Sequence, residues 1–79
     1  MDRGSLDEAI EEFNAAIRLD PQYADAYSNL GLAKKKKGML VQAKQALERA
    51  LELHPEHVDA KRNFAEVTLL LKATPRWGH

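Results

Sequence analysis

Apolar residues recur at intervals of three and four along most of the 79-residue chain, the spacing that places them on one face of an α-helix. The pattern predicts four helices. The first has Ser5 as its expected N-cap and ends ahead of Pro21, which cannot continue a helix. The second ends at Gly38, the third before Pro55 and the fourth near Lys72. No segment alternates as a strand does, so we expect an all-α fold with short turns.

The chain repeats itself at an offset of 34 residues. At this offset residues 4–23 align with residues 38–57, and residues 24–38 align with residues 58–72. Self-similarity at this period is typical of helix–turn–helix units that stack on one another. The aligned positions with identical residues are Gly4 and Gly38, Leu6 and Leu40, Ala9 and Ala43, Ala16 and Ala50, Leu19 and Leu53, Pro21 and Pro55, Asp25 and Asp59, Ala26 and Ala60, and Asn29 and Asn63.

The segment 24–57 resembles the tetratricopeptide repeat. Its residues at seven signature positions of that family are Tyr27, Leu30, Gly31, Ala43, Leu47, Ala50 and Pro55. Lys34 replaces the second aromatic residue of the family's first helix. Gly31 and Ala43 lack bulk, so the paired helices can approach closely while larger apolar residues fill the space around them. The resemblance implies an α-solenoid fragment built from antiparallel helix–turn–helix repeats.

The resemblance also divides the chain, which we take as a single domain over residues 1–79. Residues 4–23 correspond to the second helix of a repeat, and residues 24–57 form a complete repeat. Residues 58–72 correspond to the first helix of a repeat or to a capping helix. Residues 73–79, with Trp77, form a tail that we expect to be frayed rather than folded back onto the fourth helix.

The family resemblance implies a non-catalytic protein–protein interaction module that binds an extended peptide or protein segment in its concave groove. Asn29 and Asn63 occupy the same column of the two repeats, and an amide can both donate to and accept from a peptide backbone. Alternatively, the two asparagines bond the neighbouring helix. The expected groove residues are Asp25, Ser28, Asn29, Leu32, Lys36, Arg62, Asn63 and Glu66.

A second function of a different class follows from the half repeats. The first and fourth helices each lack the partner that would cover one apolar face, and an exposed apolar patch often marks a contact surface. Unpaired terminal helices of two chains could complete a repeat, which predicts a self-associating scaffold, either a homodimer or a higher oligomer. The expected self-association residues are Ala9, Phe13, Phe64, Ala65, Leu69 and Leu70.

Composition narrows the possible functions further. Twelve lysines and arginines balance twelve acids, which argues against a nucleic-acid binder held by bulk charge. The run Lys34–Lys37 is therefore interpreted as a solvated helix end. The charge is uneven, because the first 25 residues carry seven acids against two bases. No apolar run is long enough to span a bilayer, and we find no signal peptide, so we expect a cytoplasmic protein without membrane contact.

The sequence contains no catalytic constellation. Cysteine is absent, which excludes a disulfide or a thiol nucleophile. His54 and His57 could suggest a metal pair, but the 34-residue alignment places both in a turn, and we interpret them as turn residues. We therefore expect no enzyme activity, no metal and no cofactor, and a protein or peptide as the partner.

Overall fold

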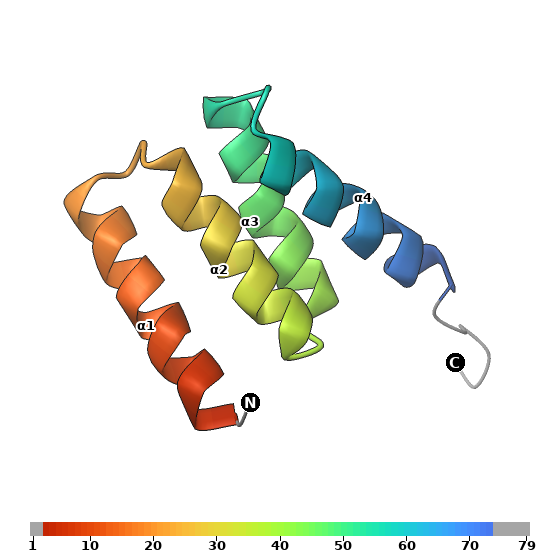
Figure 1. Cartoon of the computed structure of the whole chain (residues 1–79), viewed down its shortest axis with the longest axis horizontal. Helices are drawn as coiled ribbons and strands as arrows, with labels where there is room; N and C mark the ends of the chain where they lie inside the picture. Colours follow the sequence, from red (N-terminus) through yellow and green to blue (C-terminus); the bar gives the residue numbers. More distant parts are fainter. Residues whose placement is uncertain (1–2, 74–79) are drawn as a thin grey trace.

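The computed structural model describes residues 3–73, with side chains from Ser5 onward. These residues form four α-helices joined by short turns: α1 (Arg3–Leu19), α2 (Ala24–Lys36), α3 (Leu40–Leu53) and α4 (Val58–Ala73). The helices run side by side as an antiparallel array in which α2 occupies the centre (Figure 1). The fold is an all-α helical repeat, as the sequence predicts.

Some helix boundaries differ from the prediction. The backbone is already helical at Arg3, so Ser5 lies within the first turn of α1 and is not its N-cap. The fourth helix extends one residue further than expected, to Ala73. That residue begins the expected tail, and the rest of the tail, including Trp77, lies outside the described residues.

The second helix ends in a tight turn that depends on a glycine. The amide of Met39 donates to the carbonyl of Lys34 at 2.9 Å, and the amide of Gly38 donates to that of Lys35 at 2.9 Å. This double closure requires a left-handed residue after the helix, and Gly38 has φ of +82°. The helix therefore ends at Lys36, two residues before the glycine that the sequence marks as its stop.

The 34-residue sequence repeat is also a structural repeat. After α1, the amide of Tyr23 donates to the carbonyl of Asp20 at 3.1 Å. After α3, the amide of His57 donates to that of His54 at the same distance, 3.1 Å. Each pair stands 34 positions from the other, so α1 corresponds to α3 and α2 corresponds to α4.

The core lies where α2 crosses α3. A side chain at Gly31 would place its Cβ 2.6 Å from Cγ of Leu47 and 3.2 Å from the carbonyl oxygen of Ala43, so the two backbones approach as only glycine permits. Leu47 is fully buried there, and burial of such a side chain contributes about 1.5–3 kcal/mol. The fully buried apolar residues of this core are Ala43, Leu47, Ala50, Ala60 and Val67.

The fourth helix is held to the centre by polar contacts as well as apolar ones. The ammonium group of Lys35 donates to the side-chain carbonyl of Asn63 at 3.3 Å and forms an ion pair with Glu66. This hydrogen bond and positive charge hold the pKa of Glu66 below its ordinary value. The contact therefore joins α2 directly to α4.

The lysine run at the end of α2 is bonded rather than simply solvated, which corrects the interpretation from sequence. Lys34 donates to the side-chain carbonyl of Gln42 on α3 at 3.2 Å. Lys35 reaches α4, and Lys37 forms an ion pair with Asp7 on α1. Because the helix ends beside three others, its lysines meet acceptors that sequence spacing alone does not reveal.

Packing leaves the outer helices partly uncovered. In the described part of the chain, α1 packs against α2 but not against α3 or α4, whereas α4 packs against both α3 and α2. Only the central helices therefore have neighbours on both sides. One face of α1 and one face of α4 remain accessible.

The close approach at Gly31 predicts the effect of a single methyl group. Intrinsic helix propensity alone would make Gly31→Ala stabilising by up to about 1 kcal/mol. Because the new Cβ would overlap Leu47, we expect instead a net loss of about 1–2 kcal/mol in the free energy of unfolding, measured by urea denaturation. A stabilising substitution would contradict the close approach. Gln45→Ala at an exposed position of α3 is the control and should change stability little.

The lowered pKa of Glu66 predicts a loss of stability in acid. The unfolded chain binds this proton more tightly, so the stabilisation is fully present above the ordinary glutamate pKa of 4.5 and is lost as pH falls through the lower folded value. We expect Glu66→Gln to flatten the pH dependence of the melting temperature below pH 5. Glu56→Gln is the control at an exposed ion pair, and an equal effect there would contradict the assignment.

Candidate functional site

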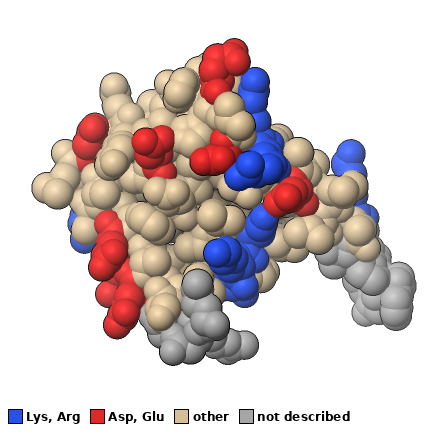
Figure 2. Space-filling view, viewed as in Figure 1, with Lys and Arg blue, Asp and Glu red and all other residues tan. Residues whose placement is uncertain are grey.

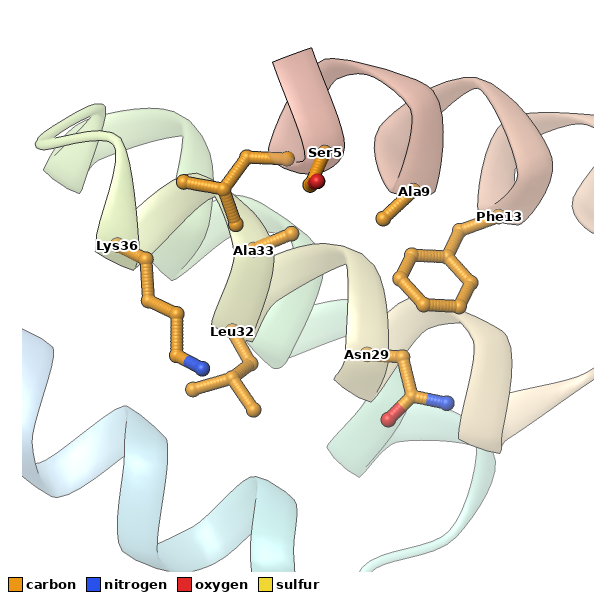
Figure 3. Close-up of a pocket in the computed structure, with 8 residues that line it drawn as sticks. Ser5, Ala9, Phe13, Asn29, Leu32, Ala33 and Lys36 are labelled. Carbon is orange, nitrogen blue, oxygen red and sulfur yellow. The ribbon is translucent and has the colours of Figure 1, made fainter. Parts of the chain in front are cut away.

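A pocket of about 300 Å³ lies between α1 and α2. We call it the α1/α2 pocket. Figure 3 shows Ala9 and Phe13 reaching from α1 toward α2, with Asn29 and Lys36 along the side that α2 provides. Its surface is mainly apolar, with few polar groups. The lining residues are Ser5, Leu6, Ala9, Phe13, Asn29, Leu32, Ala33 and Lys36.

Residues from both predicted sets meet in this pocket. Three expected groove residues, Asn29, Leu32 and Lys36, provide the α2 wall. Two expected self-association residues, Ala9 and Phe13, provide the α1 wall. The two hypotheses from sequence therefore share one surface, which neither the groove column nor the apolar stripe of α1 indicates alone.

The two aligned asparagines have different surroundings. Asn63 is only 4% exposed and accepts the hydrogen bond from Lys35, so it bonds the neighbouring helix. Asn29 is exposed and lines the α1/α2 pocket. Ser28, another expected groove residue, is buried. Within the groove set, therefore, Asn29 offers its amide at the surface while Asn63 and Ser28 lie inside the fold.

The remaining groove residues lie outside the pocket. A carboxylate oxygen of Asp25 lies 2.6 Å from Nε2 of His57, which links the start of α2 to the start of α4. The other ring nitrogen of His57 accepts the backbone amide of Ala60 at 3.1 Å. Arg62 donates to Asp59 one helical turn away at 2.9 Å, and Glu66 pairs with Lys35 as described above.

The contacts of His57 explain the segment His54–His57. The ring of His57 accepts from the first turn of α4, and the ring of His54 packs edge-on against it with centroids 5.5 Å apart. Both residues belong to the turn between α3 and α4. In residues 3–73, no group of three or more histidines and carboxylates is arranged to hold a metal ion.

A second accessible surface lies on α4. We call it the α4 face, lined by Phe64, Ala65, Thr68, Leu69 and Lys72, with a volume of about 350 Å³. It includes three expected self-association residues. Leu69 is 68% exposed, a large apolar area left in water. Leu70, predicted with this set, is also exposed but does not line the α4 face.

Charge is distributed unevenly over the surface. Figure 2 shows acidic side chains along α1 and basic ones gathered near the end of α2. The α1/α2 pocket therefore lies between an acidic helix and a basic helix end, with Lys36 on its α2 side. Among the described residues, no helix is long and apolar enough to cross a membrane.

Sequence reasoning missed two parts of this site. Leu6 and Ala33 line the pocket although neither was assigned to a site, and Lys35 forms the link to Asn63. The signal for Leu6 was available, because it aligns with Leu40, which packs against the core. The role of Lys35 depends on the crossing of α2 and α4 in space.

Comparison with known proteins agrees with the architecture. Models of the TPR repeat and of the tetratricopeptide repeat match residues 1–38 and residues 24–57. A TPR repeat-containing protein of Pseudomonas aeruginosa, PA0015, is 32% identical over 76 residues, covering 96% of this chain and 71% of that protein. The second model spans the same 34 residues as the complete repeat expected from sequence.

Other relatives are much longer than this chain. It is 40% identical over 65 residues to the mouse protein O-mannosyl-transferase TMTC1, which covers 82% of this chain but 7% of that protein. It is 39% identical to a peroxisomal targeting signal receptor of Candida albicans, over 82% of this chain and 11% of the receptor. The matching region of these proteins is a small part of each. The matched models, together with the similarity to PA0015, show that the chain belongs to the tetratricopeptide repeat family.

Proposed function

We propose that the chain is a non-catalytic interaction module whose α1/α2 pocket binds a segment of a partner protein. Tetratricopeptide repeats generally mediate protein–protein interaction, and the finer assignment rests on the pocket itself. A concave, mainly apolar surface with a few polar groups at its edge has the character of a binding site. The juxtaposition of the Phe13 ring with the exposed Asn29 amide is the observation that carries the proposal.

The lining residues suggest the chemistry of the bound segment. Phe13 and Leu32 offer apolar area, which favours a partner with large apolar side chains. Asn29 can donate to or accept from a backbone group, and Lys36 can attract a carboxylate. Asp25 and Arg62 remain exposed at the surface and are available to a longer segment. We assign Asn63 and Ser28 to the fold because both are buried.

The relative with a receptor function supports this proposal in general terms. The Candida albicans protein is named a receptor for a targeting signal, which is a protein segment. The shared region is 39% identical, so a comparable interaction role is reasonable for this chain. The identity of the segment is not carried over.

Self-association is the second candidate, favoured by the α4 face. Leu69 is exposed beside Phe64 and Ala65, and an accessible apolar surface of this kind favours contact with another protein surface. The two candidates are compatible, because the α1/α2 pocket and the α4 face are separate surfaces.

The two asparagines provide a matched test of the binding proposal. We expect Asn29→Ala to weaken binding of a responsive peptide, chosen from a diverse set, by about tenfold, with little change in stability. Asn63→Ala should lower the free energy of unfolding by about 1–3 kcal/mol, because Lys35 loses a partly buried acceptor. Peptide titration followed by amide NMR signals gives the affinity, and urea denaturation gives the stability.

The NMR titration also shows where the peptide binds. Signals of Phe13, Asn29 and Leu32 should shift together on binding. A set of shifts confined to α3, or the absence of any responsive peptide, would contradict the proposed pocket.

A further inference from the structure

The α1/α2 pocket has an occupied counterpart inside the same chain. Because α1 corresponds to α3 and α2 corresponds to α4, the counterpart lies between α3 and α4. The occupant there is α2, which packs against both helices. The chain therefore contains its own example of how such a site is filled, and the ligand in that example is a helix.

Two contacts fix α2 in this internal site. Gly31 lies against Leu47, close to the backbone of Ala43, which sets how near the helices approach. One turn later, Lys35 contacts Asn63 and Glu66 on α4. A small residue followed after four positions by a side chain matched to α4 thus defines the occupant.

The same wall is present in the α1/α2 pocket. Moving 34 positions toward the amino terminus replaces Leu47 and Ala43 by Phe13 and Ala9. The residues in place of Asn63 and Glu66 are Asn29 and Leu32. The four replacements, Ala9, Phe13, Asn29 and Leu32, all line the pocket. The pocket is therefore shaped for a helix in the manner of α2.

The chain holds a second helix of the α2 type, which is α4. Moving 34 positions toward the carboxyl terminus replaces Gly31 by Ala65 and Lys35 by Leu69. Both residues are exposed and lie on the α4 face. Ala65 keeps a small side chain at the close approach, and the flat ring of Phe13 stands where the branched Leu47 stands in the internal site.

A paired exchange matches α4 to the pocket. Within the chain, the charged Lys35 meets the charged Glu66. At the equivalent contact between two copies, the apolar Leu69 would meet the apolar Leu32. Both members change from charged to apolar together, so neither a buried unpaired charge nor a mismatch results. Helix α1 also carries more acids than bases and α4 more bases than acids, which favours the same pairing.

We propose that α4 of one copy docks into the α1/α2 pocket of a second copy, with Ala65 against Phe13 and Leu69 against Leu32. This inference rests on the proposed binding role of the pocket and names its occupant. The contact is head-to-tail, because it joins different surfaces of the two copies. Each added copy leaves one pocket and one α4 face free, so assembly continues with concentration instead of closing at a dimer.

Sedimentation velocity of the full chain over a wide concentration range tests the proposal. The weight-average sedimentation coefficient should rise continuously with concentration. Leu69→Lys and Leu32→Glu should each weaken association at least tenfold, equivalent to about 1.4 kcal/mol, since each places a charge opposite leucine. Val41→Lys is the matched control, because Val41 is 60% exposed on α3 and lies outside both surfaces.

A mixture of the two variants gives the decisive result. In an equimolar mixture, the introduced lysine of one variant would face the introduced glutamate of the other at one contact, while the two native leucines face each other at the next. Association should therefore return to near the wild-type level, although each variant alone stays dissociated. The double variant Leu32→Glu/Leu69→Lys should associate by itself. Circular dichroism confirms that every variant keeps its helical content.

Other outcomes would overturn the inference. A wild-type chain that stays monomeric at millimolar concentration rules out this docking, and so does a mixture that fails to recover. Peptide binding detected at Phe13 and Asn29 in a monomeric chain would leave the pocket as a binding site but assign it another occupant. Loss of peptide binding together with intact self-association would instead count against the proposed peptide role alone.

Discussion

The arrangement of this protein depends on the close crossing of α2 and α3. Gly31 lies so near Leu47 that a single added carbon would overlap it, and Leu47 is fully buried as a result. This contact places α2 at the centre of the array, with α1 on one side and α4 on the other. The lysines at the end of α2 can then reach acceptors on three different helices.

The central position of α2 also determines the accessible surfaces. Since α2 covers the inner face of α3, the equivalent face of α1 remains free and becomes one wall of the α1/α2 pocket. Phe13 lies on that face in the place that Leu47 takes in the core. The same residue pattern thus makes a hydrophobic core where a helix is present and a binding pocket where it is absent.

Much of the fold was predictable from the sequence because apolar spacing and a 34-residue repeat are local patterns. They predicted the four helices, the turn at Gly38 and the apolar roles of Ala43 and Leu47. The site was less predictable, as Asn29 and Asn63 illustrate. They share a column, yet only Asn63 meets Lys35, because a helix covers that position. Such side-chain pairs depend on how helices cross in space, which periodicity does not specify.

A paramagnetic label tests most directly whether the pocket accepts a helix from a second copy. The chain has no cysteine, so Lys72→Cys allows a single spin label at the end of the α4 face. In a mixture with unlabelled, ¹⁵N-enriched chains, the account predicts that amide signals of Ser5, Leu6 and Ala9 broaden, while that of Leu53 does not. Broadening centred on α4 of the enriched copies, or no broadening at high concentration, would contradict it.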